Sequence, residues 1–334
     1  MEEFAAVYTR VDAAEAHVPR RAPVLLAAVL SLALVSLSLV HVRAPAPAEA
    51  LPVVSTRTLG SAHCVFLHGA GSNETGPPTP TFPAYWGAIH EHTPACAHRQ
   101  FLHADTLHQG WEDESLQRSV CELINAAARP VQQGAARPAR RVLIFAHSMG
   151  NLVLAAALSH NVCTLPAHAG WFAAAPPWLG SRAAERIPAL CSGGAGQALE
   201  RLARRVGMCD GAGHGPSRGY WSVRTSNREL ATLGTWRNRV NATMCGSSPF
   251  GFWWSADAYE LRALAAYARI PRPNDGVVTI SSCTPLGHPP LQHSDPAGAG
   301  VYVAAADHFD LTCRHGDGWI GADRRPCAWY AARS

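Results

Sequence analysis

The sequence predicts an α/β protein with a doubly wound, mostly parallel sheet. Short apolar runs, typical of buried strands, alternate with helical patterns after residue 60. One such run, VLIFA at 142–146, is followed by His147, Ser148 and Gly150 and then by a helical stretch at 152–158. The 334 residues are 48% hydrophobic, which suits a large packed domain, and we assign this domain to residues 60–334.

The remaining elements follow from their local patterns. Residues 113–129 predict an amphipathic helix whose apolar side chains share one face, with Asp113 as a candidate N-cap. A second helix is expected at 257–270. From 182 to 274 the pattern loosens into Gly-rich and aromatic stretches, where we expect an inserted cap or lid. The strand candidates lie in residues 64–69, which run into a Gly-rich loop, and in 169–177, which include an exit loop. The others are residues 100–105, 142–146, 276–282 and 300–305.

The N-terminal region predicts a transmembrane signal anchor. Residues 24–42 contain no charged side chain and approach the length of a bilayer span. Arg20 and Arg21 precede this stretch and only Arg43 follows closely, which places the tail of residues 1–23 in the cytosol. After a linker at 43–59, the domain of a type II membrane protein would be luminal or extracellular. Cleavage near the small residues at 46–50 is the alternative, and it would give a secreted protein.

The charge and the cysteine spacing indicate which kinds of partner and binding site to expect. The net charge of +4 is mild and the basic residues are scattered, which argues against a nucleic-acid partner. The ten cysteines are widely spaced, as in a disulfide-bonded protein of an oxidising compartment, and lack the short paired spacings of zinc sites. We expect no metal and no cofactor. Sequons at Asn73 and Asn241 predict glycosylation.

The run at 142–146 ends in a candidate nucleophile. Ala146-His147-Ser148-Met149-Gly150 fits the pattern small-x-Ser-x-Gly, in which a serine occupies a strained turn between a strand and a helix. Small residues two before and two after the serine avoid collision with neighbouring backbone. The alternative is an ordinary helix-capping serine.

A nucleophilic serine needs a base, and the base needs an acid. His308 follows the last strand candidate, so its ring is expected at the carboxyl edge of the sheet with Ser148. Asp275 lies upstream of His308 and is the favoured acid. His288 and His293 are weaker candidates for the base, and Asp257 and Asp295 compete for the acid. Asp307 and Asp310 lie too close to His308 along the chain.

Two backbone amides are expected to form an oxyanion hole. Met149 follows the serine and supplies one N–H group. The Gly-rich segment LHGAG at 67–71 follows the first strand candidate, and its Ala70 is the expected second donor.

These segments together resemble the α/β-hydrolase superfamily, in its lipase-like branch. The resemblance covers roughly residues 60–312 and lies in VFLHGAG, AHSMGN, APPWLGS, NDGVV and DHFDL. It implies Ser148, Asp275 and His308 as the catalytic triad, with Ala70 and Met149 at the oxyanion hole. It also places Pro177 and Trp178 beside the substrate pocket, where His68 and His147 are further candidates. Asn151 departs from the family pattern, which commonly has a second Gly there.

The resemblance implies a serine hydrolase that cleaves carboxylic esters of the lipid type through an acyl-serine intermediate, with an ester or lipid as its substrate. The membrane is an expected partner through the N-terminal helix. An acyltransferase with the same triad is the first alternative. A catalytically silent binding or adhesion domain on a hydrolase scaffold is the second alternative, although such domains generally lack a triad residue.

Overall fold

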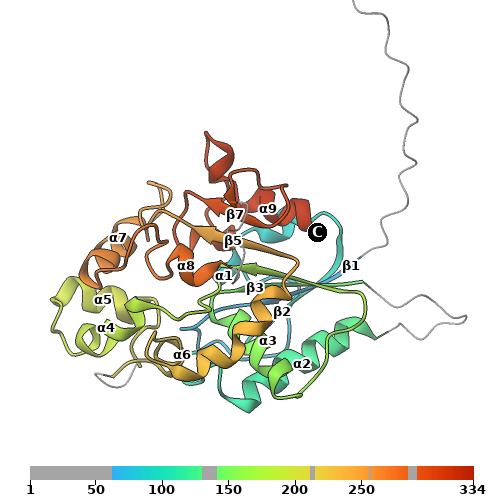
Figure 1. Cartoon of the computed structure of the whole chain (residues 1–334), viewed down its shortest axis with the longest axis horizontal. Coiled ribbons are helices and arrows are strands. Elements are labelled where there is room, and N and C mark those ends of the chain that lie inside the picture. The colour runs from blue at the N-terminus through green and yellow to red at the C-terminus, as the bar shows by residue number, and fades with distance from the viewer. Residues whose placement is uncertain (1–61, 130–140, 211–214, 256, 285–291) are drawn as a thin grey trace, which may run out of the picture. The chain divides into compact units, whose positions relative to one another are not determined.

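A seven-stranded sheet forms the centre of the domain in the computed structural model (Figure 1). The structure describes residues 62–129, 141–210, 215–255, 257–284 and 292–334. Neighbouring strands in the order β2-β1-β3-β4-β5-β7-β6 all pair in parallel, as the alternating pattern predicts. The strands are β1 (Ala62–Leu67), β2 (Cys96–Phe101), β3 (Val142–His147), β4 (Ala169–Ala174), β5 (Ala242–Gly246), β6 (Gln292–His293) and β7 (Val301–Ala304).

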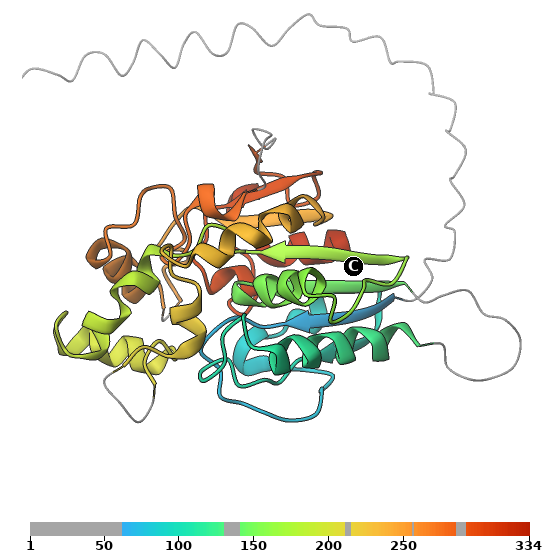
Figure 2. The same ribbon diagram turned by 60° about the horizontal axis from the view of Figure 1, so that its bottom comes forward.

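Helices cover both faces of this sheet (Figure 2). Alternate side chains of β3 enter two separate cores, Ile144 on one face and Phe145 on the other. The first core packs against α2 (Glu114–Ala128) and α3 (Met149–Ser159), and the second against α1 (Pro83–Trp86) and α9 (Pro326–Arg333). All six residues of β3 are buried, which explains its unbroken apolar run.

Among the described residues, four helices follow β4 in the chain before β5, and in Figure 2 the first three lie beyond the ends to which the strand arrows point, while the fourth packs against α3. These are α4 (Arg182–Cys191), α5 (Gln197–Arg205), α6 (Arg218–Ser222) and η2 (Arg228–Asn238). The remaining helices are η1 (Ile89–His92), α7 (Ala258–Tyr267), α8 (Ile280–Cys283), η3 (Asp310–Thr312) and η4 (Ala322–Arg324).

The interval 182–274 is not a single insertion, because it contains a central strand of the sheet. β5 pairs with β4 on one side and β7 on the other. Its five residues, ATMCG, are all buried. The segment was missed because Thr, Cys and Gly interrupt the apolar run that marks a buried strand.

The strand expected at 276–282 is also wrong. The chain turns at Gly276, whose φ is 98°, and α8 begins at Ile280. The carboxylate of Asp275 accepts hydrogen bonds from the amides of Val277 and Val278 at 2.9 and 2.6 Å, so these apolar residues belong to a buried turn. Asp113 begins α2 as expected, but its carboxylate accepts from Gly110 N instead of from an amide of the helix. β2 begins four residues before the strand expected at 100–105.

All ten cysteines form disulfides, as their even number predicts. The bridges join strands, helices and loops across the domain, and their pairing was open from the sequence. The pairs are Cys64–Cys96, Cys121–Cys163, Cys191–Cys209, Cys245–Cys283 and Cys313–Cys327.

The expected tail at 1–23, anchor at 24–42 and linker at 43–59 lie outside the described residues. Within the part of the chain that the structure does describe, no helix has the length and apolar content needed to cross a membrane.

Candidate active site

The sheet places two loops side by side at one topological switch point. After β1 the chain forms β2 on one side of it, and it later returns to form β3 on the other side. The segments that leave β1 and β3 therefore diverge, which opens a crevice at their carboxyl ends. Gly69 and Ala70 follow β1, and Ser148 follows β3, so both expected parts of the site meet there.

Ser148 occupies a strained turn between β3 and α3. Its φ of 51° and ψ of −129° are unusual for a residue with a side chain. A Cβ on Gly150 would lie 2.7 Å from the carbonyl oxygen of His68, which is the close approach that the small-residue pattern predicts. Asn151 stabilises this turn, because its Nδ2 donates to the carbonyl oxygens of Ala146 and Ser148 at 3.0 and 3.2 Å. The departure from Gly at position 151 thus has a structural role.

The structure brings the three expected triad residues together. The Nε2 atom of His308 lies 3.0 Å from the Ser148 hydroxyl, and its Nδ1 lies 2.8 Å from a carboxylate oxygen of Asp275. Because the carboxylate can only accept, Nδ1 carries the proton and Nε2 is free to accept the serine proton. All three side chains are buried, and His308 N also donates to Asp275 O at 2.8 Å. This is the geometry of an activated serine nucleophile.

The competing acids have other partners. Asp257 forms ion pairs with Arg205 and Arg314, and Asp310 accepts from His315 Nδ1 at 2.7 Å. Asp307 accepts from the amides of its own turn, and burial together with the Asp310 carboxylate raises the pKa of Asp307 well above its usual range. The exposed Asp295 accepts from Ala297 N. His288 lies outside the described residues, as does the side chain of His293.

The expected oxyanion donors flank the serine. Met149 begins α3 directly after Ser148, and Gly69 packs so closely that its Cβ would lie 2.7 Å from Ser148 Cβ. Neither Ala70 N nor Met149 N has a hydrogen-bond partner among the residues described. Two unpaired amides beside a serine can stabilise a developing oxyanion.

The parallel sheet, the strained serine turn at the end of its central strand, and the chain order Ser, Asp, His occur together. This is the α/β-hydrolase fold. No family model matches the sequence, and no curated protein does.

Among solved structures, the chain of this hydrolase fold is similar to the mature form of a Bacillus licheniformis lipase, at 15% identity over 77% of this chain and 89% of that one, with a TM-score of 0.49. A metagenomic carboxyl esterase is similar at 14% identity over 87% and 78%, with a TM-score of 0.49. EstA from Clostridium botulinum is similar at 15% identity over 86% and 92%, with a TM-score of 0.44. At such identities the chemistry has to be argued from the site itself.

A cleft of about 340 Å³ opens beside the segments that carry Ala70 and Phe309, although Ser148, Asp275 and His308 do not line it themselves. Ala70, Tyr85 and Phe309, the neighbour of His308, line one part of it, and Arg205 and Asp257 line another. The cleft thus combines an apolar wall beside the candidate oxyanion donor with charged groups from α5 and the start of α7. Tyr85 was missed from the sequence, because no motif marks a tyrosine on a short helix far from the serine.

The four residues expected to line the pocket are all buried and do not line this cleft: His68, His147, Pro177 and Trp178. Both histidines instead bond to neighbouring backbone. His68 Nδ1 donates to Gly69 O at 2.9 Å, and His147 Nε2 donates to His308 O at 2.9 Å. Burial lowers the pKa of His68 to about 4, and burial followed by the proximity of His308 lowers that of His147 well below its usual value. Both rings are therefore neutral near pH 7.

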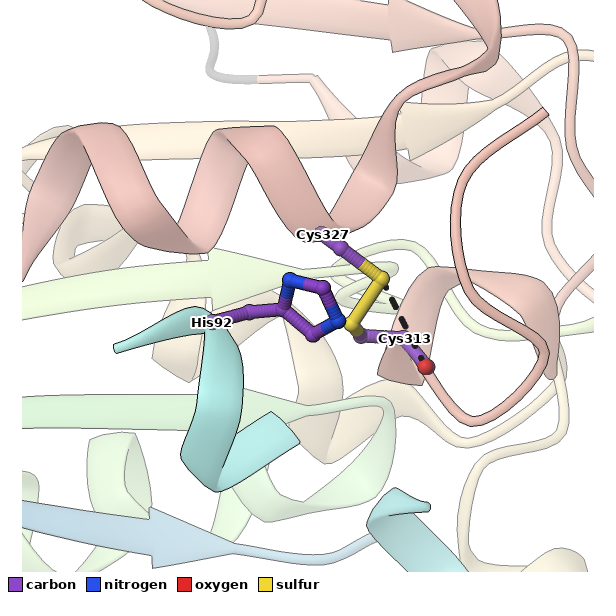
Figure 3. A group of neighbouring side chains, drawn as sticks. All are labelled: His92, Cys313 and Cys327. Atoms are coloured by element: carbon purple, nitrogen blue, oxygen red, sulfur yellow. Dashed lines mark hydrogen bonds between the residues drawn. A yellow bond between two sulfur atoms is a disulfide. The ribbon is translucent and has the colours of Figure 1, made fainter. Parts of the chain in front are cut away.

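One further group of side chains has the spacing of metal ligands. His92 lies against Cys313 and Cys327, and Figure 3 shows that the two sulfurs are bonded to each other. A disulfide offers no thiolate to a metal, so this group does not fit a metal site. Of the two sequon residues, Asn73 is exposed, and Asn241 is exposed although its Oδ1 accepts from Trp171 N at 2.7 Å.

Proposed function

We propose that this chain hydrolyses carboxylic esters through an acyl-serine intermediate. The observation that supports this most strongly is His308, which bonds to the Ser148 hydroxyl through one ring nitrogen and to Asp275 through the other. A neutral serine hydroxyl is a poor nucleophile, and this pairing is what makes it reactive.

The proposed first step acylates the serine. Ser148 Oγ attacks the ester carbonyl while its proton moves to His308 Nε2, and the Asp275 carboxylate stabilises the resulting imidazolium. The carbonyl oxygen becomes an oxyanion that accepts hydrogen bonds from the Ala70 and Met149 amides. When the carbonyl re-forms, the bond to the leaving oxygen breaks and His308 protonates the departing alcohol.

The second step releases the acid. Water loses a proton to His308 and attacks the acyl carbon, and the tetrahedral species collapses as Ser148 Oγ regains its proton. An alcohol or amine in place of water would make the chain an acyltransferase with the same residues. The cleft of about 340 Å³ is at the small end for a binding pocket, which favours a compact acyl group next to the Ala70 and Phe309 wall.

We also propose that the domain functions in the secretory lumen or outside the cell, held to the membrane by residues 24–42. Five disulfides in the described residues support an oxidising compartment.

Kinetics with the full-length chain test the proposed reaction. We expect turnover of p-nitrophenyl esters that is highest for short acyl groups and falls on the order of 10⁶-fold in Ser148→Ala. Ser192→Ala, which changes an exposed serine at the end of α4, is the matched control and should leave turnover unchanged. Turnover in Ser148→Ala close to that of the unsubstituted chain would overturn the proposal. Adding an acceptor alcohol and analysing the products separates hydrolysis from acyl transfer.

A further inference from the structure

Hydrogen bonds fix the peptide group between Gly69 and Ala70 through its carbonyl side, and we call this set of bonds the clamp. Gly69 O accepts hydrogen bonds from Thr106 Oγ1 at 2.8 Å and from His68 Nδ1 at 2.9 Å. Gly69 N donates to the Tyr85 hydroxyl at 2.7 Å. The Ala70 amide, by contrast, has no partner within the described part of the chain. Both polar backbone atoms of Gly69, its N and its O, thus have hydrogen-bond partners. The Ala70 N–H group, the candidate oxyanion donor, remains available to a ligand.

This clamp fixes the direction in which the Ala70 N–H group points. A trans peptide is planar, and its C=O and N–H bonds point in opposite directions. Hydrogen bonds that hold the Gly69 carbonyl toward Thr106 therefore turn the Ala70 amide away from Thr106. The Gly69 Cα carries this peptide group directly beside Ser148, because a Cβ at position 69 would lie 3.2 Å from Ser148 Oγ.

The Tyr85 hydroxyl links this clamp by hydrogen bonds to the loop that carries His308, the proposed base. His147 Nε2 donates to His308 O, so the Nδ1 of this neutral ring accepts, and Tyr85 Oη donates to it at 2.6 Å. Hydrogen bonds therefore run from Gly69 N through Tyr85 and His147 to the backbone of His308. Buried and fully paired networks of this kind hold their members in one arrangement.

We propose that the Tyr85 and Thr106 hydroxyls are positioning groups that present the Ala70 amide to the oxyanion and hold it in register with His308. The inference rests on the proposed ester hydrolysis and adds residues that neither strand ends nor motifs indicate. Neither hydroxyl needs to touch the substrate, since each acts through Gly69. Their effect should therefore appear in the transition state, where charge develops on the oxyanion, and not in the binding of the ester.

Single substitutions in the full-length chain test this. Tyr85→Phe and Thr106→Val each remove one hydroxyl and nearly preserve shape. We expect kcat to fall about 10- to 100-fold with KM within about twofold, less than the loss on removing an oxyanion donor outright. The affinity for an alkyl boronic acid, which forms a tetrahedral adduct with the serine, should fall by a similar factor. Thr106→Ser retains the hydroxyl and should restore kcat.

Tyr302→Phe is the matched control for loss of a buried hydroxyl. Tyr302 Oη donates to Ala322 O and accepts from Arg325 N, each at 2.9 Å, and neither partner belongs to the site. The Tyr302→Phe substitution should lower the melting temperature about as much as Tyr85→Phe does, while leaving kcat unchanged.

Three results would count against the inference. An unchanged kcat in folded Tyr85→Phe and Thr106→Val overturns it, and so does a rise in KM alone, which would make Tyr85 a substrate contact. In both cases Ser148-dependent turnover in the unsubstituted chain keeps the proposed function intact. If the unsubstituted chain lacks both this turnover and boronic acid binding, the proposed function fails and the inference fails with it.

Discussion

Gly69 lies directly against the side chain of Ser148. A Cβ added to Gly69 would lie 2.7 Å from Ser148 Cβ and 2.8 Å from the Tyr85 hydroxyl, closer than real Cβ contacts allow. Gly69→Ala should therefore displace the serine or the oxyanion loop, and we expect kcat/KM to fall at least 100-fold, on the scale of losing an oxyanion donor. Gly76→Ala is the control, because a Cβ there meets no atom within 4 Å. Equal activity of the two variants would contradict the close packing at the serine.

The proposed acid of the triad can be tested by a substitution that nearly preserves its shape. Asp275 accepts through one oxygen from two backbone amides and through the other from His308. In Asp275→Asn the neutral amide no longer stabilises the imidazolium or fixes the ring tautomer, so kcat should fall on the order of 10⁴-fold. Asp295→Asn, on an exposed turn, should leave kcat within twofold. A comparable loss in Asp295→Asn, or none in Asp275→Asn, would assign the acid elsewhere.

Stability should depend on pH through the buried histidines. Burial lowers the pKa of His68 from 6.5 to about 4, so between these values the unfolded chain binds a proton that the folded chain does not. The contribution of His68 to the free energy of unfolding is then constant above about pH 6.5 and falls as the pH drops toward 4, by up to about 3 kcal/mol. His147 adds a loss of the same sign, since its pKa is also lowered.

Urea unfolding at pH 7, 5.5 and 4.5 measures this dependence. In His68→Asn the side chain does not titrate, so the loss of stability between pH 7 and 4.5 should be smaller than in the unsubstituted chain. Identical pH dependence in both would mean that folding does not lower the pKa of His68.

The disulfide between Cys245 and Cys283 should stabilise the segment that carries the acid. It joins β5 to α8, which follows the turn at Asp275, across 38 residues. Replacing both cysteines by serine should lower the free energy of unfolding by about 3–4 kcal/mol, because the unfolded chain gains conformational freedom. A loss below about 1 kcal/mol in urea unfolding would show that this bridge constrains little.

The fold and the site differ in how far the sequence determines them. The strand before Ser148 and the order of serine, acid and histidine could be predicted, because buried apolar runs and small residues at a strained turn leave a local pattern. β5 could not, since its ATMCG segment is buried only through its neighbours β4 and β7.

The surroundings of the site depend on tertiary contacts. Tyr85 reaches Gly69 and His147 from a four-residue helix, and His68 and His147 bond to backbone instead of lining the cleft. Asn151 stabilises the serine turn through carbonyl oxygens that only the folded backbone brings near it. The contacts of Tyr85 and His147 join distant parts of the chain, so no local pattern marks them.

The reactivity of Ser148 can be measured directly with a fluorophosphonate probe and peptide mass spectrometry. We predict a covalent adduct on the peptide that contains Ser148, no adduct in Ser148→Ala, and much slower labelling in Asp275→Asn. Labelling of Ser148→Ala at the rate of the unsubstituted chain, or an adduct on a different residue, would contradict this prediction.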